Sequence, residues 1–221
     1  MDNYGKDYEK FLKSETNVPR TMIDAHMQHQ NLVTPHILEE RQMNVTQMDV
    51  FSRLMKDRII FLHDSVSTDS MAVIKAQLLF LDSVNQNDIK IYIDSPGGGV
   101  IAGLSLYDVM NYVKSDIETV TMGMAASMGS IIASSGTKGK RHILPHSRFM
   151  IHDIRGGAQG TYLDMQRSLD LSKELRDELF NILAQNSGQT VKYIEKNCDR
   201  DTWLKAEDAV KLGFVDTIIK R

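Results

Sequence analysis

The sequence predicts an α/β fold made of repeated strand–turn–helix units, in which helices cover a parallel sheet. Isoleucines at Ile89, Ile91 and Ile93 alternate with more polar residues, which is the period-two pattern of a strand. An apolar stripe at helical spacing precedes this strand over residues 71–81, and a second stripe follows it over residues 100–110. Such pairs of strand and helix recur about every thirty residues, which is typical of parallel α/β folds.

The first part of the chain differs from the rest. Residues 1–31 are polar and keep no apolar period, which favours a mobile leader outside the core. Residues 32–44 gain apolar side chains, but Pro35 interrupts them, so we expect an irregular segment or loop. Apolar residues at three-residue steps over residues 48–55 then predict a short helix.

The repeated units follow in order. Residues 58–62 form an apolar run that predicts a buried strand, and residues 67–69 supply capping side chains for the helix over 71–81. The strand at residues 89–93 ends in Asp94-Ser95-Pro96-Gly97-Gly98-Gly99, a turn that leads into the next helix. Residues 117–121 are apolar and β-branched, which predicts a third strand.

The second half of the chain carries longer and shorter elements. Residues 138–141 are basic without interleaved aromatic residues, which favours a solvated hairpin over a nucleic-acid contact. Residues 149–152 predict a short strand, and residues 161–185 carry the longest amphipathic helical pattern. A last helix over residues 205–212 ends at Gly213 and precedes a closing strand.

Ser127 stands where a strand is expected to turn into a helix. Small residues, Ala125 and Gly129, lie two positions before and after it, as in a G-x-S-x-G nucleophile elbow with alanine for the first glycine. Such a turn exposes the hydroxyl and places the N–H of Met128 at a helix N-terminus, where it stabilises negative charge. A small-residue helix start selected for close packing explains this local pattern equally well.

A nucleophilic serine needs a base and an acceptor that orients the base. Of the 7 histidines, His152 has the best context, because it ends an apolar strand beside a glycine-rich stretch. A structural histidine at a strand end is the alternative. The pattern alone does not select the acid from five candidates: Asp94, Asp153, Asp199, Asp201 and Asp216.

An oxyanion also needs donors. The loop at residues 97–99 offers backbone N–H groups without side chains, and together with Met128 it would form a two-donor hole. A plain tight turn is the alternative. The chain has no G-x-x-x-x-G-K-[ST] motif, so we expect no ATP hydrolysis by the chain itself, and it has no H-E-x-x-H or C-x-x-C pair, so we expect no zinc.

Composition limits the class of protein. The 221 residues suffice for one sizeable domain with or without an appendage, and a net charge of −3 gives no field that favours nucleic acid or anionic membrane. Cys198 is the single cysteine, which fits a reducing compartment and a buried structural role. The uncharged run over residues 119–137 holds too many hydroxyls and glycines for a lipid-facing helix. We therefore expect a cytoplasmic protein without a membrane segment.

Four segments together resemble the Clp protease family of serine peptidases: Tyr92–Gly98, Gly123–Gly129, Ser147–His152 and Asp199–Trp203. The likeness covers roughly residues 33–221. It implies a crotonase-like core with a protruding handle at about residues 153–188, within a single domain over residues 32–221. It also implies an axial segment at about residues 32–47 and a propeptide over residues 1–31 that the protein trims itself.

The resemblance implies a role for each site residue. Ser127 matches the family's nucleophile, His152 its general base and Asp201 its orienting carboxylate. The backbone N–H groups of Gly98 and Met128 match the oxyanion donors. This order along the chain differs from that of the α/β-hydrolases, which argues against their fold. No cofactor or metal is implied.

The resemblance also implies an assembly. A serine endopeptidase of this kind hydrolyses unfolded polypeptides to short peptides inside a tetradecamer of two stacked heptameric rings, as part of protein quality control. An AAA+ unfoldase docks on the rings and supplies ATP hydrolysis. Arg200 is expected in an ion pair between rings, and Tyr92 and Tyr112 in the cleft where the unfoldase docks. Rings of one chain and rings mixed with a second isoform both stay open.

The chain departs from the family at three positions. Asp153 and Ile154 replace the usual Gln-Pro after the histidine, and Gly99 stands where a bulkier residue is common. An extra carboxylate beside the base would favour its protonated form. Two other functions remain to be weighed: an acyl-CoA enzyme that uses the oxyanion hole without a serine nucleophile, and a non-catalytic ring subunit that scaffolds an active isoform.

Overall fold

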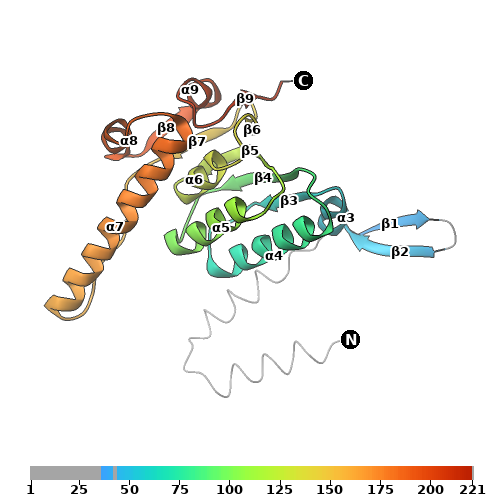
Figure 1. The fold of residues 1–221 in the computed structure, drawn as a ribbon, viewed down its shortest axis with the longest axis horizontal. Helices are drawn as coiled ribbons and strands as arrows, with labels where there is room; N and C mark the ends of the chain where they lie inside the picture. Colours follow the sequence, from blue (N-terminus) through green and yellow to red (C-terminus); the bar gives the residue numbers. More distant parts are fainter. Residues whose placement is uncertain (1–35, 42–43, 221) are drawn as a thin grey trace, which may run out of the picture. The chain divides into compact units, whose positions relative to one another are not determined.

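The structure is a computed structural model that describes residues 36–41 and 44–220 (Figure 1). Contacts divide the chain into two compact units, Met1–Arg53 and Leu54–Arg221, and each is described by itself. The expected leader over residues 1–31 lies outside the described residues, so its trimming stays a prediction.

The described part of the first unit is an antiparallel pair of strands, β1 (His36–Arg41) and β2 (Asn44–Asp49), in register from His36 opposite Asp49 to Arg41 opposite Asn44. The expectation of an irregular segment was wrong here, because backbone pairing between the two stretches outweighs the break that Pro35 suggested. The short helix α3 (Val50–Lys56) begins later than expected. The Asp49 carboxylate accepts a hydrogen bond from the N–H of Ser52 at 3.0 Å, which caps the helix after β2.

The second unit is built on a largely parallel sheet (Figure 1). Its main path runs β3 (Ile59–Leu62), β4 (Ile89–Ser95), β5 (Ile117–Ala126), β6 (Arg141–Ile143) and β9 (Thr217–Ile218). The far end of β5 also pairs in parallel with β7 (Arg148–Ile151), which pairs antiparallel with β8 (Thr202–Lys205). The long strand β5 therefore joins the main path to the β7–β8 pair, and the α/β class predicted from the sequence is confirmed.

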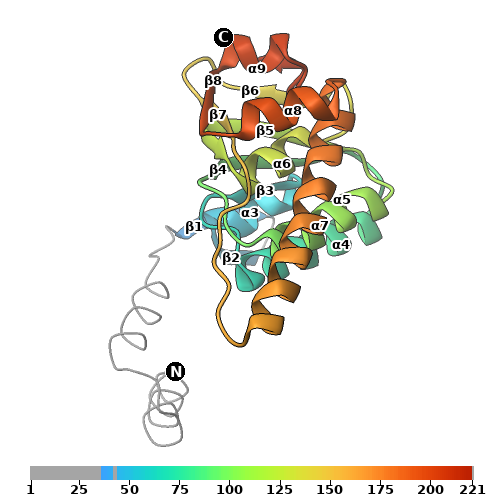
Figure 2. The same ribbon diagram turned by 90° about the vertical axis from the view of Figure 1, so that its left-hand side faces the viewer.

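Helices cover this sheet. They are α4 (Thr68–Val84), α5 (Val100–Tyr112), α6 (Met128–Ser134), α7 (Tyr162–Ser187), α8 (Val191–Cys198) and α9 (Ala206–Lys211). Helices α4 and α5 lie side by side along the sheet (Figure 2). Ser67 caps α4, as the sequence predicted, and forms a capping box with Ser70, which the sequence did not single out.

The core lies between the sheet and these helices. Ile89, Ile91 and Ile93 of β4 are each 0% exposed, which confirms the alternating pattern. The stripe that α4 turns inward, Met71, Ile74, Leu78 and Leu81, is buried as well. Each large apolar side chain that is buried contributes about 2 kcal/mol, so this layer stabilises the unit.

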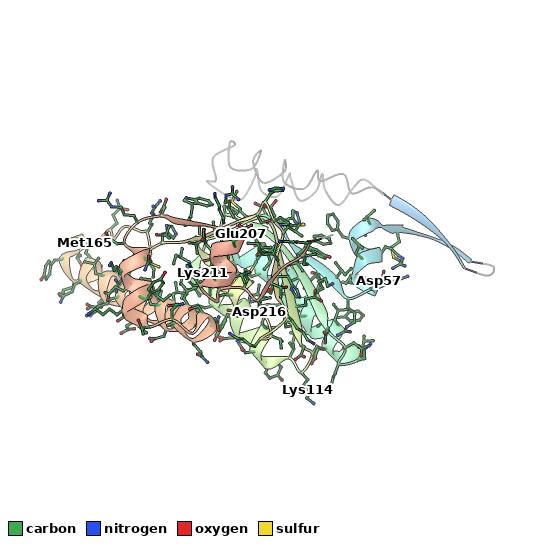
Figure 3. All side chains as sticks on the ribbon, turned by 90° about the horizontal axis from the view of Figure 1, so that it is seen from above. Asp57, Lys114, Met165, Glu207, Lys211 and Asp216 are labelled. Carbon is green, nitrogen blue, oxygen red and sulfur yellow. The ribbon has the colours of Figure 1, made fainter. Side chains whose placement is uncertain are left out.

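Helix α7 is the long helix that the sequence predicted from about residue 161. Thr161 and Asp164 form a capping box at its start, and the N–H of Asp164 donates to the Thr161 hydroxyl. Its first turns expose apolar side chains such as Leu163 and Leu169, and Met165 marks this end in Figure 3. Its last turns are buried and pack against α6 and α8.

The sequence suggested that the basic turn over residues 138–141 is solvated, but one of its residues, Arg141, is buried. The side chain of Arg141 is 1% exposed, and its Nη2 lies 2.6 Å from Oδ1 of Asp216, which follows α9 (Figure 3). Its guanidinium also donates to the carbonyls of Ser134, Asn186 and Gly213. Arg141 is buried because these acceptors from α6, α7 and the end of α9 satisfy its donors.

Candidate active site

Ser127 is the single residue between β5 and α6. Its backbone has φ 54° and ψ −124°, a conformation that costs a non-glycine residue about 1–3 kcal/mol. Two contacts hold it there: its N–H donates to the carbonyl of Met150 in β7 at 3.0 Å, and Gly97 packs against it from the loop after β4. A Cβ on Gly97 would lie 2.6 Å from the Cβ of Ser127. The strained turn therefore places the hydroxyl where two strands end.

His152 follows β7 directly. Because Ala126 lies opposite Met150 in the parallel pair of β5 and β7, the residues after both strands emerge at the same edge. The Nε2 atom of His152 lies 2.7 Å from the Oγ of Ser127, within hydrogen-bond distance. The imidazole is thus placed to accept the serine proton, and its side chain is 14% exposed.

Asp201 directly precedes β8, which runs antiparallel to β7. Ile151 lies opposite Thr202 in the antiparallel pair of β7 and β8, so the residue before β8 lies beside the residue after β7. The Oδ1 atom of Asp201 lies 3.2 Å from the Nδ1 of His152. The same oxygen accepts a hydrogen bond from Nη2 of Arg155, a residue that the sequence did not single out. Its signal was present, as a cation three positions after the expected base.

The expected oxyanion donors lie next to the nucleophile. Val66 holds the loop after β4: its N–H donates to the carbonyl of Gly97 at 2.9 Å, and its carbonyl accepts from Gly99 at 2.7 Å. The N–H of Met128 begins α6. Among the described residues, neither the N–H of Gly98 nor that of Met128 donates a hydrogen bond. Two backbone donors therefore remain for a ligand beside the serine hydroxyl.

A cavity of about 180 Å³ adjoins these groups. Ser127 and His152 stand at it, and Arg155 contributes to its lining. Most of its wall is apolar and comes from β7, the segment after it and α7: Ile151, Ile154, Leu179, Phe180 and Leu183. A space of this size and character accepts one apolar side chain of an extended peptide.

Three of the other candidate acids have separate partners. Asp94 accepts from the N–H of Met124 at 3.0 Å, and Asp216 pairs with Arg141. The carboxylate of Asp153 lies 2.9 Å from Nε of Arg176 in α7. Of the five candidates that the sequence left open, Asp201 is the one whose carboxylate contacts His152.

The Asp153 carboxylate is thus paired with a cation of α7. Arg176, which holds its carboxylate, also lies 3.1 Å from Oε1 of Glu195 and 4.4 Å above the ring of Phe180. Hydrogen bonds, first to Asp153 and then to Glu195, raise the pKa of Arg176. The extra carboxylate is part of a network that joins the segment after β7 to α7 and α8.

The residues expected at contacts with other chains do not line this cavity. Arg200 is exposed in the loop between α8 and β8. Tyr92 lies in β4 and stacks on Phe61 with ring centroids 5.5 Å apart, whereas Tyr112 ends α5 with 79% of its surface exposed. The structure describes one chain, so their partners stay predictions.

Other chemistry finds little support. Burial, and after it the charge of Asp153, raises the pKa of the Cys198 thiol to about 12, so the thiol stays protonated and unreactive. Within residues 36–41 and 44–220, no three His, Cys, Asp or Glu side chains gather as metal ligands would. In the same described part of the chain, no helix combines the length and hydropathy that crossing a bilayer requires.

Comparisons with known proteins agree on one family. The family described as Clp protease matches residues 40–221. The chain is 45% identical over 215 residues to an ATP-dependent Clp protease proteolytic subunit of Bacteroides fragilis, covering 96% of this chain and 98% of that protein. It is 44% identical over 217 residues to the protein of the same name from Porphyromonas gingivalis, covering 97% and 98%. A Streptococcus pyogenes protein of that name is 46% identical over 189 residues, covering 84% and 96%.

Proposed function

The chain belongs to the Clp protease family, and from this premise we propose that Ser127, His152 and Asp201 are its catalytic triad. The family and the names of its relatives make it a serine peptidase, the proteolytic subunit of an ATP-dependent protease. The contact of 2.7 Å between Nε2 of His152 and Oγ of Ser127 carries the assignment.

Each of these groups has a defined role in the proposed mechanism. Oγ of Ser127 attacks the peptide carbonyl while its proton passes to Nε2 of His152. Asp201 accepts a hydrogen bond from Nδ1–H, which fixes the tautomer that leaves Nε2 free, and stabilises the imidazolium. The N–H groups of Gly98 and Met128 stabilise the oxyanion. The imidazolium then protonates the leaving amine, and water hydrolyses the acyl-enzyme by the same steps.

The substrate is an unfolded polypeptide, cleaved to short peptides. The cavity of about 180 Å³ beside Ser127 accepts one side chain of an extended segment, and an unfolded polypeptide presents such segments along its whole length, which supports this proposal. Because the sequence has no phosphate-binding motif, an AAA+ unfoldase is the partner that hydrolyses ATP. Tyr92 and Tyr112 belong to its docking cleft. The protein needs no cofactor or metal, binds no nucleic acid or membrane, and works in the cytoplasm.

The assembly is two stacked heptameric rings, of this chain alone or mixed with a second isoform. The exposed apolar residues at the start of α7, within the handle at about 153–188, support contact between rings. Arg200 forms an ion pair at this contact. Residues 1–31 are a propeptide, residues 32–47 the axial segment, and residues 32–221 the protease domain.

The test replaces the nucleophile. Ser127→Ala should abolish cleavage of a fluorogenic peptide and labelling by a fluorophosphonate, while native mass shows that assembly survives. Ser135→Ala is the matched control, because it removes a hydroxyl from the other end of α6 that bonds the Ile131 carbonyl. Peptide mapping should find the label on Ser127. Normal peptide cleavage by Ser127→Ala would refute the assignment.

The same experiment separates the alternatives. An acyl-CoA enzyme on this core would bind its substrate through the oxyanion donors but would not react with a fluorophosphonate, because only an activated serine does. A non-catalytic ring subunit would assemble and yet never cleave the fluorogenic peptide. Labelling at Ser127 together with cleavage excludes both.

A further inference from the structure

We propose that Arg155 is a positioning residue that shares the Asp201 carboxylate with His152, and that its charge extends the protease's activity to lower pH. The inference rests on the proposed triad, because Arg155 acts on the reaction only through Asp201 and His152. It concerns a residue that neither the nucleophile pattern nor the family's site residues include.

The geometry places two donors on one oxygen. Oδ1 of Asp201 lies 3.2 Å from Nδ1 of His152 and also accepts from Nη2 of Arg155. Among the described residues, these two side chains are the only hydrogen-bond partners of this carboxylate. The side chain of Asp201 is 39% exposed, so the protein backbone does not enclose it. Arg155 is therefore the group other than the base that restricts where the carboxylate points.

Of the charged side chains around the site, Arg155 is the cation that acts on the Asp201 carboxylate. Arg176 of α7 is engaged by Asp153, beside the base in sequence, and by Glu195 of α8. Cys198 of α8 is protonated. Asp199 and Arg200, on the loop that carries Asp201, have opposite formal charges. Arg155 alone among the described cations contacts the triad carboxylate.

The positive charge of Arg155 extends the pH range in which His152 acts as a base. The Asp201 carboxylate stabilises the protonated form of His152, which cannot accept the serine proton. A guanidinium on the same oxygen offsets part of this stabilisation. Base function therefore persists to lower pH with Arg155 present. The Arg155 side chain is 69% exposed, so solvent screens its charge, and the shift in the acid limb is about 0.2–0.7 pH unit.

The experiment measures kcat/KM against pH with a capped, uncharged fluorogenic peptide. Arg155→Gln removes the charge, Arg155→Met is a second uncharged variant in case the first does not assemble, and Arg155→Lys keeps the charge. Arg148→Gln is the matched control, because Arg148 begins β7 and bonds the carbonyls of His146 and Ser147 rather than the triad. It lies four residues from His152 along an extended strand, roughly 13 Å and about a Debye length away.

The expected result is that the acid limb of Arg155→Gln moves to higher pH by about 0.2–0.7 unit, while Arg155→Lys and Arg148→Gln follow the wild type. An acid limb of Arg155→Gln that coincides with the wild type would overturn the proposal, and so would a lysine variant that behaves like the glutamine variant. Failure of the triad itself is distinguishable, because it would appear in the wild type as fluorophosphonate labelling absent from Ser127.

Discussion

Gly97→Ala tests whether the loop after β4 holds the nucleophile in place. Gly97 has φ +89°, and a Cβ there would lie 2.6 Å from the carbonyl oxygen of Ala126 and 2.8 Å from the N–H nitrogen of Met128. Both are backbone atoms, so no side-chain rotation relieves the clash, and the turn that carries Ser127 must move.

The magnitude has two parts. The left-handed φ costs alanine about 1–2 kcal/mol, and the overpacked contact adds about 1–3 kcal/mol to the loss of unfolding free energy. Activity falls further, because a displaced Met128 N–H no longer meets the oxyanion, and loss of one such donor lowers kcat about 100-fold to 1,000-fold.

Gly139→Ala supplies the control. Gly139 has nearly the same φ, +87°, but a Cβ there would meet nothing within 4 Å. This variant should lose only the cost of the φ, about 1–2 kcal/mol, and keep full activity. Thermal unfolding gives the stability difference, and peptide cleavage gives kcat. Equal stability and equal kcat of the two alanine variants would refute the clash argument.

Three further variants test other parts of the structure. Asp201→Asn should lower kcat about 10,000-fold, with thermal unfolding nearly unchanged. Asp216→Asn should cost about 3 kcal/mol at neutral pH by thermal unfolding, because it leaves buried Arg141 unpaired. Burial works to raise the pKa of Asp216, but hydrogen bonds from Arg141 and Gly139 lower it overall. The stability that ionised Asp216 contributes is therefore complete above the unfolded pKa of about 3.9 and disappears as the pH falls through the lower folded pKa. The asparagine variant should lack this part of the acid sensitivity. Ile154→Trp should fill the cavity and reduce kcat/KM about tenfold for peptides with a bulky apolar side chain at the cleaved bond, with fluorophosphonate labelling retained.

The departure at Asp153 shows how a changed residue next to a catalytic one finds a partner elsewhere. Its carboxylate binds Arg176, and its N–H donates to the carbonyl of Cys198 at 2.7 Å. The segment after β7 is therefore tied to α7 and α8. The charge that does contact the triad is a cation two positions later, at Arg155.

Local periodicity sufficed for the regular elements. The isoleucines of β4, the capping residue Ser67 of α4 and the long amphipathic pattern of α7 each specify an element through its immediate neighbours, and the structure confirms all three. The β1–β2 hairpin was missed, because the pairing of two short strands produces no clear pattern in the sequence of either strand. The burial of Arg141 was missed as well, because its acceptors come from three distant elements.

The sequence by itself predicted the α/β class and the strand ends at which chemistry collects, and it offered Ser127 and His152 as candidates for nucleophile and base, each with a structural alternative. It left five carboxylates open by pattern, and only resemblance to a family selected Asp201. The tertiary structure decided the rest, because β7 pairs with both β5 and β8 and so brings together residues that are 25 and 49 positions apart. Strand pairing over such separations depends on the whole sheet, and no short stretch of the chain encodes it.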